Sequence, residues 1–430
     1  MWERRQPTIV LDDDVTGTQE SSDVPVLLRW DVPRVRQAVA DRSVVHLMTN
    51  ARALDAVAAA RIVRDAAETA VAATPRARII LRGDSTLRGH LLPEYLALRD
   101  AAFGGLDRTL LLVPALPAAG RVTINGVHCL KRGTEYVPLE QSEYANDGDF
   151  SYHSARLLDW AEERSAGHFP ARAGLEVPLD VIRSRGPVAV TEAILALRGR
   201  GPAILAPDAQ TIADLQTIAS GLDTAERLGV QVIVRCAPTF AAVTSGALAT
   251  GFAAPPSPSG GLLIVCGSYV SNTGQQLADL RAAMRVEAIE VDVDGVIDAA
   301  SVDREVRRVA TTAAARLGLE GIALISTPRE RHPSALSLDA GARIASALGH
   351  IVRAIDPPPG VVLAKGGITS QVALTVGFST DEARVVGPLA AGVSLWDVTS
   401  GGRHIPYVVF PGNTGDARAL TAVVGSIMRP

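Results

Sequence analysis

Three consecutive carboxylates near the start of the chain are the first residues that could carry out chemistry. Asp12, Asp13 and Asp14 directly follow residues 9–11, an apolar segment typical of a buried strand. Functional crevices of α/β sheets open at the carboxyl ends of their strands, and a carboxylate placed there can orient or deprotonate a hydroxyl group. Because Asp is also common in turns and helix caps, this turn alone fits an ordinary structural role equally well.

A second turn of related design follows the apolar residues 79–81. It contains a carboxylate, two hydroxyl groups and two guanidinium groups, and it reads Arg82-Gly83-Asp84-Ser85-Thr86-Leu87-Arg88-Gly89. Guanidinium groups bind carboxylates and other anions in a fixed, bidentate geometry. Together the two turns predict one cleft in which carboxylates face guanidinium groups and a polar, anionic small molecule binds.

Three glycine-containing loops in the second half of the chain each follow an apolar segment. They are Gly267-Ser268, Lys365-Gly366-Gly367-Ile368-Thr369-Ser370 and Gly412-Asn413-Thr414-Gly415. Glycine permits close backbone approach, backbone N–H groups at a helix start can bind an anion, and Lys365 adds a point charge. The loops together indicate one nucleotide pocket, although each alone also fits a tight turn or a helix cap. Neither a P-loop nor a GxGxxG fingerprint is present, so the standard patterns do not identify the nucleotide.

Apolar segments and helical stretches alternate along the chain, and this alternation predicts the elements that position the loops. The Pro-, Ser- and Gly-rich stretch 253–261 is predicted to link an N-terminal domain, 1–252, to a C-terminal domain, 262–430. We therefore expect an α/β protein of two α/β domains with largely parallel sheets and an active site in the interdomain cleft. Strands are expected at 43–48, 78–82, 109–113, 203–206, 230–234, 262–266, 287–291, 322–326 and 361–364, and helices at 53–73, 208–228, 273–285, 303–317, 338–354 and 369–376.

The polar segment 120–152 interrupts this alternation. It contains Lys131, Arg132, Asp147 and Asp149. Two interpretations fit: a long functional loop, or a solvated excursion without a role. The first is slightly favoured, because long loops in compact domains usually have a function.

Composition excludes several classes of protein. With 430 residues, 47% of them hydrophobic, the chain is long enough for two or three domains. A net charge of −4 and only 4% aromatic residues argue against nucleic-acid binding. No apolar run is long enough to span a bilayer, and residues 1–7 lack the apolar core of a signal peptide, so we expect a cytoplasmic protein with no membrane partner.

Three widely spaced cysteines, Cys129, Cys236 and Cys266, fit neither a disulfide framework nor a zinc site. We expect them to pack in the core.

At the two N-terminal turns the sequence resembles the four-carbon acid sugar kinase family, and the resemblance extends over nearly the whole chain. Asp13 and Asp14 match the paired aspartates of an ADDxTGxxD-like motif. The turn from Arg82 to Gly89 is similar to a KxDSTLRGN-like motif, with Arg82 in place of lysine and His90 in place of asparagine. Arg52 matches an arginine that the family places after its second strand to meet the acid substrate.

The C-terminal loops resemble the same family's nucleotide-binding domain. Gly267-Ser268 is similar to its GS loop, and Gly366-Gly367-Ile368-Thr369-Ser370 to its GGxTS loop. Gly412-Asn413-Thr414-Gly415 is similar to the final GNxG loop, but Phe410-Pro411 stand where many members have a Lys-Ser pair.

The resemblance implies transfer of the γ-phosphate of ATP, with Mg²⁺, to the terminal C4 hydroxyl of threonate, erythronate or 3-oxo-tetronate. Asp13 or Asp14 would orient or deprotonate this hydroxyl. The acid substrate would be bound by Arg52, Arg82, Asp84, Ser85, Thr86 and Arg88, and ATP by Ser268, the residues from Lys365 to Ser370, Gly412 and Asn413. No protein ligand of Mg²⁺ is assigned, and a homodimer is compatible with the resemblance.

Two other classes of protein remain open at this point. A non-catalytic acid-sugar sensor would keep the N-terminal site and lose nucleotide binding. A dehydrogenase would use the second domain for a dinucleotide, but the fingerprint that this requires is missing.

Overall fold

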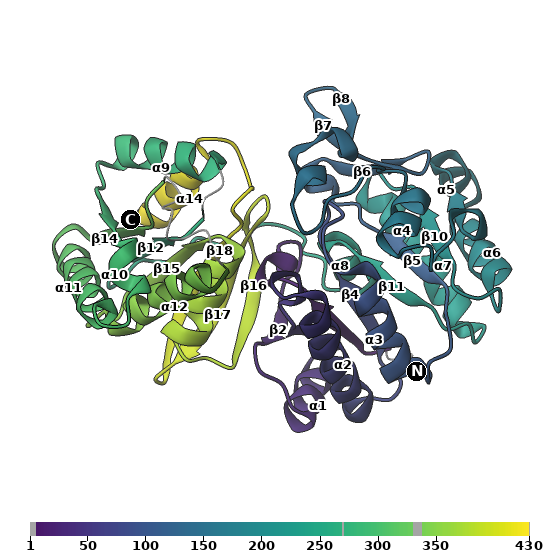
Figure 1. The fold of residues 1–430 in the computed structure, drawn as a ribbon, viewed down its shortest axis with the longest axis horizontal. Coiled ribbons are helices and arrows are strands. Elements are labelled where there is room, and N and C mark those ends of the chain that lie inside the picture. Colours follow the sequence, from purple (N-terminus) through teal and green to yellow (C-terminus); the bar gives the residue numbers. More distant parts are fainter. Residues whose placement is uncertain (1–5, 269–270, 330–337, 430) are drawn as a thin grey trace. The chain divides into compact units, whose positions relative to one another are not determined.

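The computed structural model describes residues 6–268, 271–329 and 338–429, and it divides into two compact units, 1–249 and 250–430 (Figure 1). Both combine a sheet with helices, so the protein is of the α/β class as predicted. In the part of the chain that is described, no helix is both long and apolar enough to cross a membrane.

The N-terminal unit contains an eight-stranded sheet in the order β2-β3-β1-β4-β11-β5-β10-β9, and every neighbouring pair is parallel. Its strands are β1 (Thr8–Asp12), β2 (Val24–Leu27), β3 (Val44–Met48), β4 (Arg78–Arg82), β5 (Leu110–Val113), β9 (Leu175–Val177), β10 (Ile204–Pro207) and β11 (Ile233–Cys236). Its helices are α1 (Val32–Asp41), α2 (Ala56–Ala73), α3 (Leu91–Phe103), α4 (Leu157–Arg164), α5 (Leu179–Arg185), α6 (Pro187–Leu197), α7 (Ile212–Arg227) and α8 (Pro238–Ser245).

The central strands are buried at every position, as expected for a parallel sheet covered on both faces. Ile9 and Leu11 of β1 pack in a core with the alanine-rich face of α2, whose first turn is capped by Asp55. The parallel register places Asp12 directly beside Arg82, so the last residues of β1 and β4 are neighbours.

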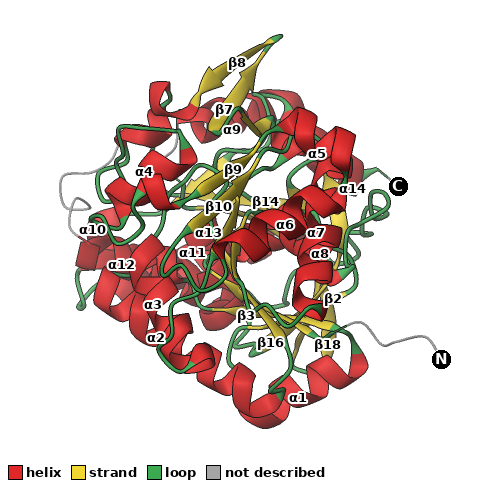
Figure 2. Ribbon diagram, turned by 90° about the vertical axis from the view of Figure 1, so that its right-hand side faces the viewer, coloured by secondary structure: helices red, strands yellow, loops and turns green. Residues whose placement is uncertain are grey.

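The segment 120–152 is not a loop, contrary to the prediction. It forms a separate antiparallel sheet of β6 (Arg121–Ile124), β7 (Val127–Arg132) and β8 (Glu135–Pro138), followed by two short 3-10 helices. The β7–β8 hairpin projects from the N-terminal unit (Figure 2). Its polar composition masked the strand pattern, because the tip of a projecting hairpin is solvated on both faces.

The C-terminal unit contains a sheet in the order β13-β14-β12-β15-β18-β17-β16, parallel from β13 to β18 and antiparallel from β18 to β16. Its strands are β12 (Leu262–Cys266), β13 (Ala288–Glu290), β14 (Ile322–Ser326), β15 (Val361–Lys365), β16 (Glu382–Ala390), β17 (Val393–Ser400) and β18 (Arg403–Phe410). Its helices are α9 (Ser271–Met284), α10 (Val293–Ile297), α11 (Val302–Glu320), α12 (Leu338–Ala354), α13 (Gly367–Val372), which continues into a π-helical turn at Ala373–Gly377, and α14 (Ala419–Met428).

Most of the predicted strands and helices of both units lie within a few residues of the observed ones. The sequence analysis did not identify the antiparallel strands β16–β18. In β16 the pairing with β17 is irregular around Gly387-Pro388, and this interruption broke the alternating pattern that would have revealed the strand. The parallel register aligns Cys266 with Lys365 and Lys365 with Phe410, so three loops leave the sheet side by side.

Candidate functional site

Asp12 is the centre of a buried polar cluster at the end of β1. Its side chain is fully buried, and one carboxylate oxygen lies 2.8 Å from Nδ1 of His46. The other oxygen pairs with the Arg82 guanidinium. Gly17 packs so closely on this pair that an added Cβ would overlap both side chains. Asp12 therefore holds the side chains of His46 and Arg82 in place at the end of β1.

Asp13 and Asp14 lie in contrasting environments. Asp13 is 2% exposed, and Oδ1 lies 2.9 Å from Arg82 Nη1, but neither oxygen has a hydrogen-bond partner among the described residues. Burial raises its pKa to about 6. Asp14 accepts a 2.7 Å hydrogen bond from the Thr16 amide and pairs with Arg52. Burial opposes its charge, but Arg52 and Arg82 outweigh burial and hold its pKa below the ordinary value.

Asp84 is the one carboxylate of the second turn. It accepts hydrogen bonds from the Thr86 hydroxyl and, at 2.6 Å, from Arg88 Nε, and it lies 3.6 Å from Arg52 Nη1. Burial opposes its charge, yet Arg88 and Arg52 bring its pKa far below the ordinary value. Asp84 is therefore ionised, and it fixes the two arginines beside it.

Backbone geometry holds the second turn in an unusual conformation. Leu87 has a φ of 65° and Gly89 a φ of 114°. The Ser85 carbonyl accepts a 2.9 Å hydrogen bond from His128 Nε2, and the Thr86 carbonyl accepts one of 3.1 Å from the Tyr152 hydroxyl. The separate β6–β8 sheet and the segment after it thus support the turn.

A buried ion pair that the sequence analysis missed lies under the same turn. Arg235 of β11 pairs with Glu94 of α3, and both side chains are at most 5% exposed. A Cβ added at Gly83 or at Gly89 would lie 2.9 Å from Arg235 Nη2. In the sequence, this pair is indicated only by Arg235, a charged residue inside the apolar strand β11. A buried charge needs a partner, so such a residue predicts a nearby carboxylate.

The structure brings most of the predicted acid-sugar residues together. Asp13, Asp14, Arg52, Asp84, Thr86 and Arg88 form one network of ion pairs and hydrogen bonds. The other two differ: Ser85 contributes its carbonyl to His128, and Arg82 is 2% exposed and bound to Asp12, Asp13 and the Asp14 carbonyl. Arg82 therefore holds the aspartates in place.

In the C-terminal unit, hydrogen bonds join the three predicted nucleotide loops. The Gly267 amide donates to Thr369 Oγ1 at 3.2 Å. Thr273 Oγ1 lies 3.1 Å from Ser268 Oγ and 3.2 Å from the Gly412 carbonyl. The Gly366 amide donates to the Phe410 carbonyl at 2.8 Å. These contacts gather the loops at the carboxyl ends of β12, β15 and β18.

Gly366 and Gly367 form the turn from β15 into α13. Gly366 has a φ of 106°, which favours glycine, and Gly367 opens α13. Ile368 is 58% exposed, and Asn413 is partly buried. The Ser370 hydroxyl is turned away and donates to the Ala364 carbonyl at 3.1 Å.

Lys365 is completely buried. Its Nζ donates to the Pro411 carbonyl at 3.2 Å and to the Gly412 carbonyl at 3.4 Å, and lies 4.3 Å from the centre of the Phe410 ring. Burial lowers its pKa to about 8. Phe410 and Pro411, the residues that depart from the family pattern, thus supply the ring and one of the carbonyls that hold the Lys365 ammonium.

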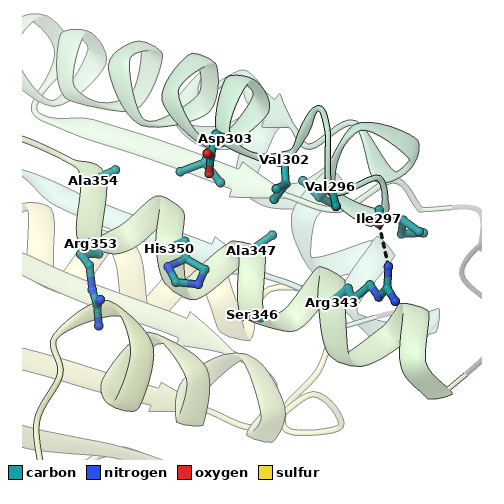
Figure 3. Close-up of a pocket in the computed structure, with 12 residues that line it drawn as sticks. Val296, Ile297, Val302, Asp303, Arg343, Ser346, Ala347, His350, Arg353 and Ala354 are labelled. Carbon is teal, nitrogen blue, oxygen red and sulfur yellow. Dashed lines mark hydrogen bonds between the residues drawn. The ribbon is translucent and has the colours of Figure 1, made fainter.

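A separate groove of about 660 Å³ lies in the C-terminal unit between α10, the start of α11 and α12 (Figure 3). Its wall combines apolar side chains with His350 and Arg353, and Arg343 donates a 3.2 Å hydrogen bond to the Ile297 carbonyl. None of the predicted site residues lines it.

Two further findings concern metals and cysteines. Among the described residues, no group of three or more His, Cys, Asp or Glu side chains could hold a metal ion. Cys129, Cys236 and Cys266 are free and buried, as predicted.

Comparison with known proteins finds one family model for each half of the chain. A sugar-binding N-terminal domain matches residues 8–244, and a nucleotide-binding C-terminal domain matches residues 263–420. The chain is 30% identical over 317 residues to a D-erythronate kinase of Heliobacterium modesticaldum, covering 70% of this chain and 66% of that protein, just under two thirds of its length. It is 27% identical over 330 residues to a D-threonate kinase of Salmonella typhimurium, covering 75% and 71%.

Solved structures share the fold. A Haemophilus influenzae protein of family DUF1537 aligns with a TM-score of 0.64 at 18% identity, over 98% of this chain and 100% of that chain. A Salmonella typhimurium protein aligns with a TM-score of 0.70 at 16% identity, over 98% and 99%. Since both domain models match in order and the fold agrees, the chain belongs to the four-carbon acid sugar kinase family.

Proposed function

We propose that this protein is an ATP-dependent kinase that phosphorylates the terminal C4 hydroxyl of a four-carbon acid sugar such as threonate, erythronate or 3-oxo-tetronate. The observation that carries the proposal is the cluster at the ends of β1 and β4, where a carboxyl with a raised pKa lies beside arginines that suit an acid substrate. The relatives named D-erythronate kinase and D-threonate kinase support the same substrate class.

Asp13 is our candidate for the general base. A base works best when its pKa lies near the working pH and its oxygens are not already bound. Asp13 has a pKa of about 6, and although Oδ1 lies 2.9 Å from Arg82 Nη1, neither oxygen has a hydrogen-bond partner among the described residues. Asp14 is occupied by the Thr16 amide and by Arg52, so we assign it an orienting role.

The acid sugar would be held by the partly exposed members of the cluster. Arg52 and Arg88 are 17% and 22% exposed, whereas Arg82 is almost inaccessible. We therefore assign substrate contact to Arg52 and Arg88, with Asp84 and Thr86 placing their guanidinium groups. Arg82 acts indirectly, by keeping Asp13 and Asp14 in position.

The C-terminal loops would hold ATP through backbone and hydroxyl groups. Gly366, Gly367 and Gly412 permit close approach of phosphates, and Ser268 and Asn413 offer polar side chains. Lys365 lies against the same loop cluster. When bound, ATP supplies the phosphoryl group, and Mg²⁺ offsets the phosphate charge. Because Mg²⁺ bound with substrate phosphates needs only one or two carboxylates, the lack of a larger ligand group among the described residues is compatible with it.

An assay of ADP release with ATP, Mg²⁺ and a panel of four-carbon acids tests the proposal. The panel contains D- and L-threonate, D-erythronate and the 3-oxo acids, and product masses are recorded. We expect ADP release with at least one acid and a product heavier by one phosphoryl group. Acid binding without any ATP binding would instead support the sensor, and failure to bind any acid would contradict the proposal.

A further inference from the structure

Arg121 differs from every other arginine around the two turns. Among the described residues, Arg52, Arg82, Arg88 and Arg235 each pair with at least one carboxylate. Arg121 lies at the start of β6. It forms no ion pair with any of the described residues, and its Nε is buried without a hydrogen-bond partner among them. A partly buried cation without a counter-charge is unfavourable unless something else supplies the charge.

The surroundings of Arg121 place it at the edge of the acid–arginine cluster. Its guanidinium carbon lies 5.7 Å from the centre of the Tyr144 ring, and that of Arg88 lies 5.5 Å from the same ring. Arg88 in turn binds Asp84 and Asp147, at 2.6 and 3.0 Å. Both guanidinium groups thus pack on Tyr144, and the charge of Arg121 also helps to lower the pKa of Asp84, the partner of Arg88.

The nearby histidine adds no positive charge at neutral pH. His128 Nε2 donates to the Ser85 carbonyl, and Nδ1 lies 3.0 Å from the Thr123 hydroxyl. Burial lowers its pKa to about 4, and the charge of Arg121 contributes to this decrease. Arg121 therefore carries the positive charge at this edge of the cluster that no direct ion pair binds among the described residues.

We propose that Arg121, together with Arg88, binds the carboxylate of the acid sugar and sets the preference for acids over neutral sugars. The inference rests on the proposed function and deepens it. A guanidinium group binds a carboxylate through two parallel hydrogen bonds. Asp84 acts on Arg121 only at longer range, and the substrate would supply the direct ion-pair partner that Arg121 lacks among the described residues.

This assignment also orients the substrate. Arg52 Nη1 lies 3.9 Å from Asp13 and 3.6 Å from Asp84, and Asp84 binds Arg88. The ion pairs therefore link Asp13, Arg52, Asp84 and Arg88 in that order, and Arg121 shares the Tyr144 ring with Arg88. A carboxylate at the Arg121 end leaves the far end of the sugar for Asp13.

The test compares Arg121→Met and Arg121→Lys with Arg132→Met, a control in the same small sheet whose ion pair with Glu143 is exposed. Binding of D-erythronate and D-threonate is measured by calorimetry without nucleotide, and thermal unfolding verifies that each variant folds. We expect Arg121→Met to weaken acid binding about 10- to 100-fold, Arg121→Lys to weaken it less, and Arg132→Met to leave it unchanged.

A kinetic experiment with a neutral substrate separates carboxylate recognition from a structural role. Erythritol keeps the four carbons and the three hydroxyl groups of erythronate but has a hydroxymethyl group in place of the carboxylate. In Arg121→Met the KM for the acid should rise while the KM for ATP and turnover of erythritol stay unchanged. Equal binding of the acids by Arg121→Met and the natural protein, or an equal loss for erythritol, would overturn the inference and leave the proposed function intact. Failure of the natural protein to bind any acid would overturn the proposed function as well.

Discussion

At the scale of single residues, the site depends on different environments for chemically identical groups. Asp13 and Asp14 are adjacent in sequence, yet burial without hydrogen bonds raises the pKa of Asp13 to about 6, whereas Arg52 and Arg82 overcome burial at Asp14 and lower its pKa. Two carboxylates whose pKa values are pushed apart can take different roles in one reaction. This contrast supports our proposal that Asp13 is the general base.

Replacing Asp13 by Asn should leave acid binding nearly intact and reduce kcat at least about 100-fold, the usual contribution of a general base. Steady-state kinetics with ATP and the best acid of the panel measure this change. Asp14→Asn is the matched comparison, and we expect it to raise the KM for the acid because Arg52 loses its closest partner. Full turnover by a folded Asp13→Asn protein would exclude Asp13 as the base.

The pH dependence of kcat/KM should show the same carboxyl. Only ionised Asp13 can accept a proton, so activity should fall as pH decreases through about 6, by up to tenfold per pH unit, and should be level above that value. Asp14 and Asp84 do not contribute to this decrease, since their lowered pKa values keep them ionised there. A profile that is flat from pH 5 to 7, in a protein that remains folded, would contradict the assignment.

Close packing around Gly17 gives a residue-scale prediction about stability. An added methyl group would overlap Arg82 and Asp12, so Gly17→Ala should lower the free energy of unfolding by about 1–3 kcal/mol. Gly148→Ala is the control, because no atom lies within 4 Å of the added carbon there. Urea denaturation of both variants measures the difference, and equal stability would show that the cluster can shift to accept the methyl group.

At the scale of elements, the ends of parallel strands create the site, and this explains what the sequence could predict. The Asp12–Asp14 turn and the turn after β4 follow apolar strands of the N-terminal unit, and the glycine loops follow apolar strands of the C-terminal unit. The α/β pattern therefore predicted that the two turns lie together at the edge of one sheet and the loops together at the edge of the other. Arg121, Arg235 and Glu94 could not be found this way. Each is a single charged residue in a strand or helix, and only tertiary packing shows what lies beside it.

The Arg235–Glu94 pair under the second turn provides the prediction at this scale. Arg235→Met leaves the carboxylate of Glu94 buried without its partner, and we expect a loss of about 3–5 kcal/mol in the free energy of unfolding. The double variant Arg235→Met, Glu94→Gln should recover part of this loss, because the buried charge is removed. Chemical denaturation of these two variants and of Glu94→Gln alone tests the coupling, and additive losses would show that the pair does not act as a unit.

At the scale of the whole molecule, the proposed binding of an acid sugar and a nucleotide depends on local positive charge. The net charge is −4, so no general positive field attracts an acid sugar or a nucleotide. In the N-terminal unit, positive charge comes from arginines near the ends of the strands. In the C-terminal unit, the glycine loops offer backbone N–H groups and one buried lysine lies beside them. In the proposed phosphoryl transfer, the N-terminal unit would bind the acid sugar and the C-terminal unit the nucleotide.

The most direct test of the central claim is the position of the phosphate on the product. The natural protein is incubated with ATP, Mg²⁺ and D-erythronate or D-threonate, and the product is examined by phosphorus and carbon NMR, with Asp13→Asn as the control. Our account predicts a single phosphate ester at C4, formed by the natural protein and almost absent with the variant. An ester at another carbon, or no phosphorylated acid although both acid and ATP bind, would contradict it.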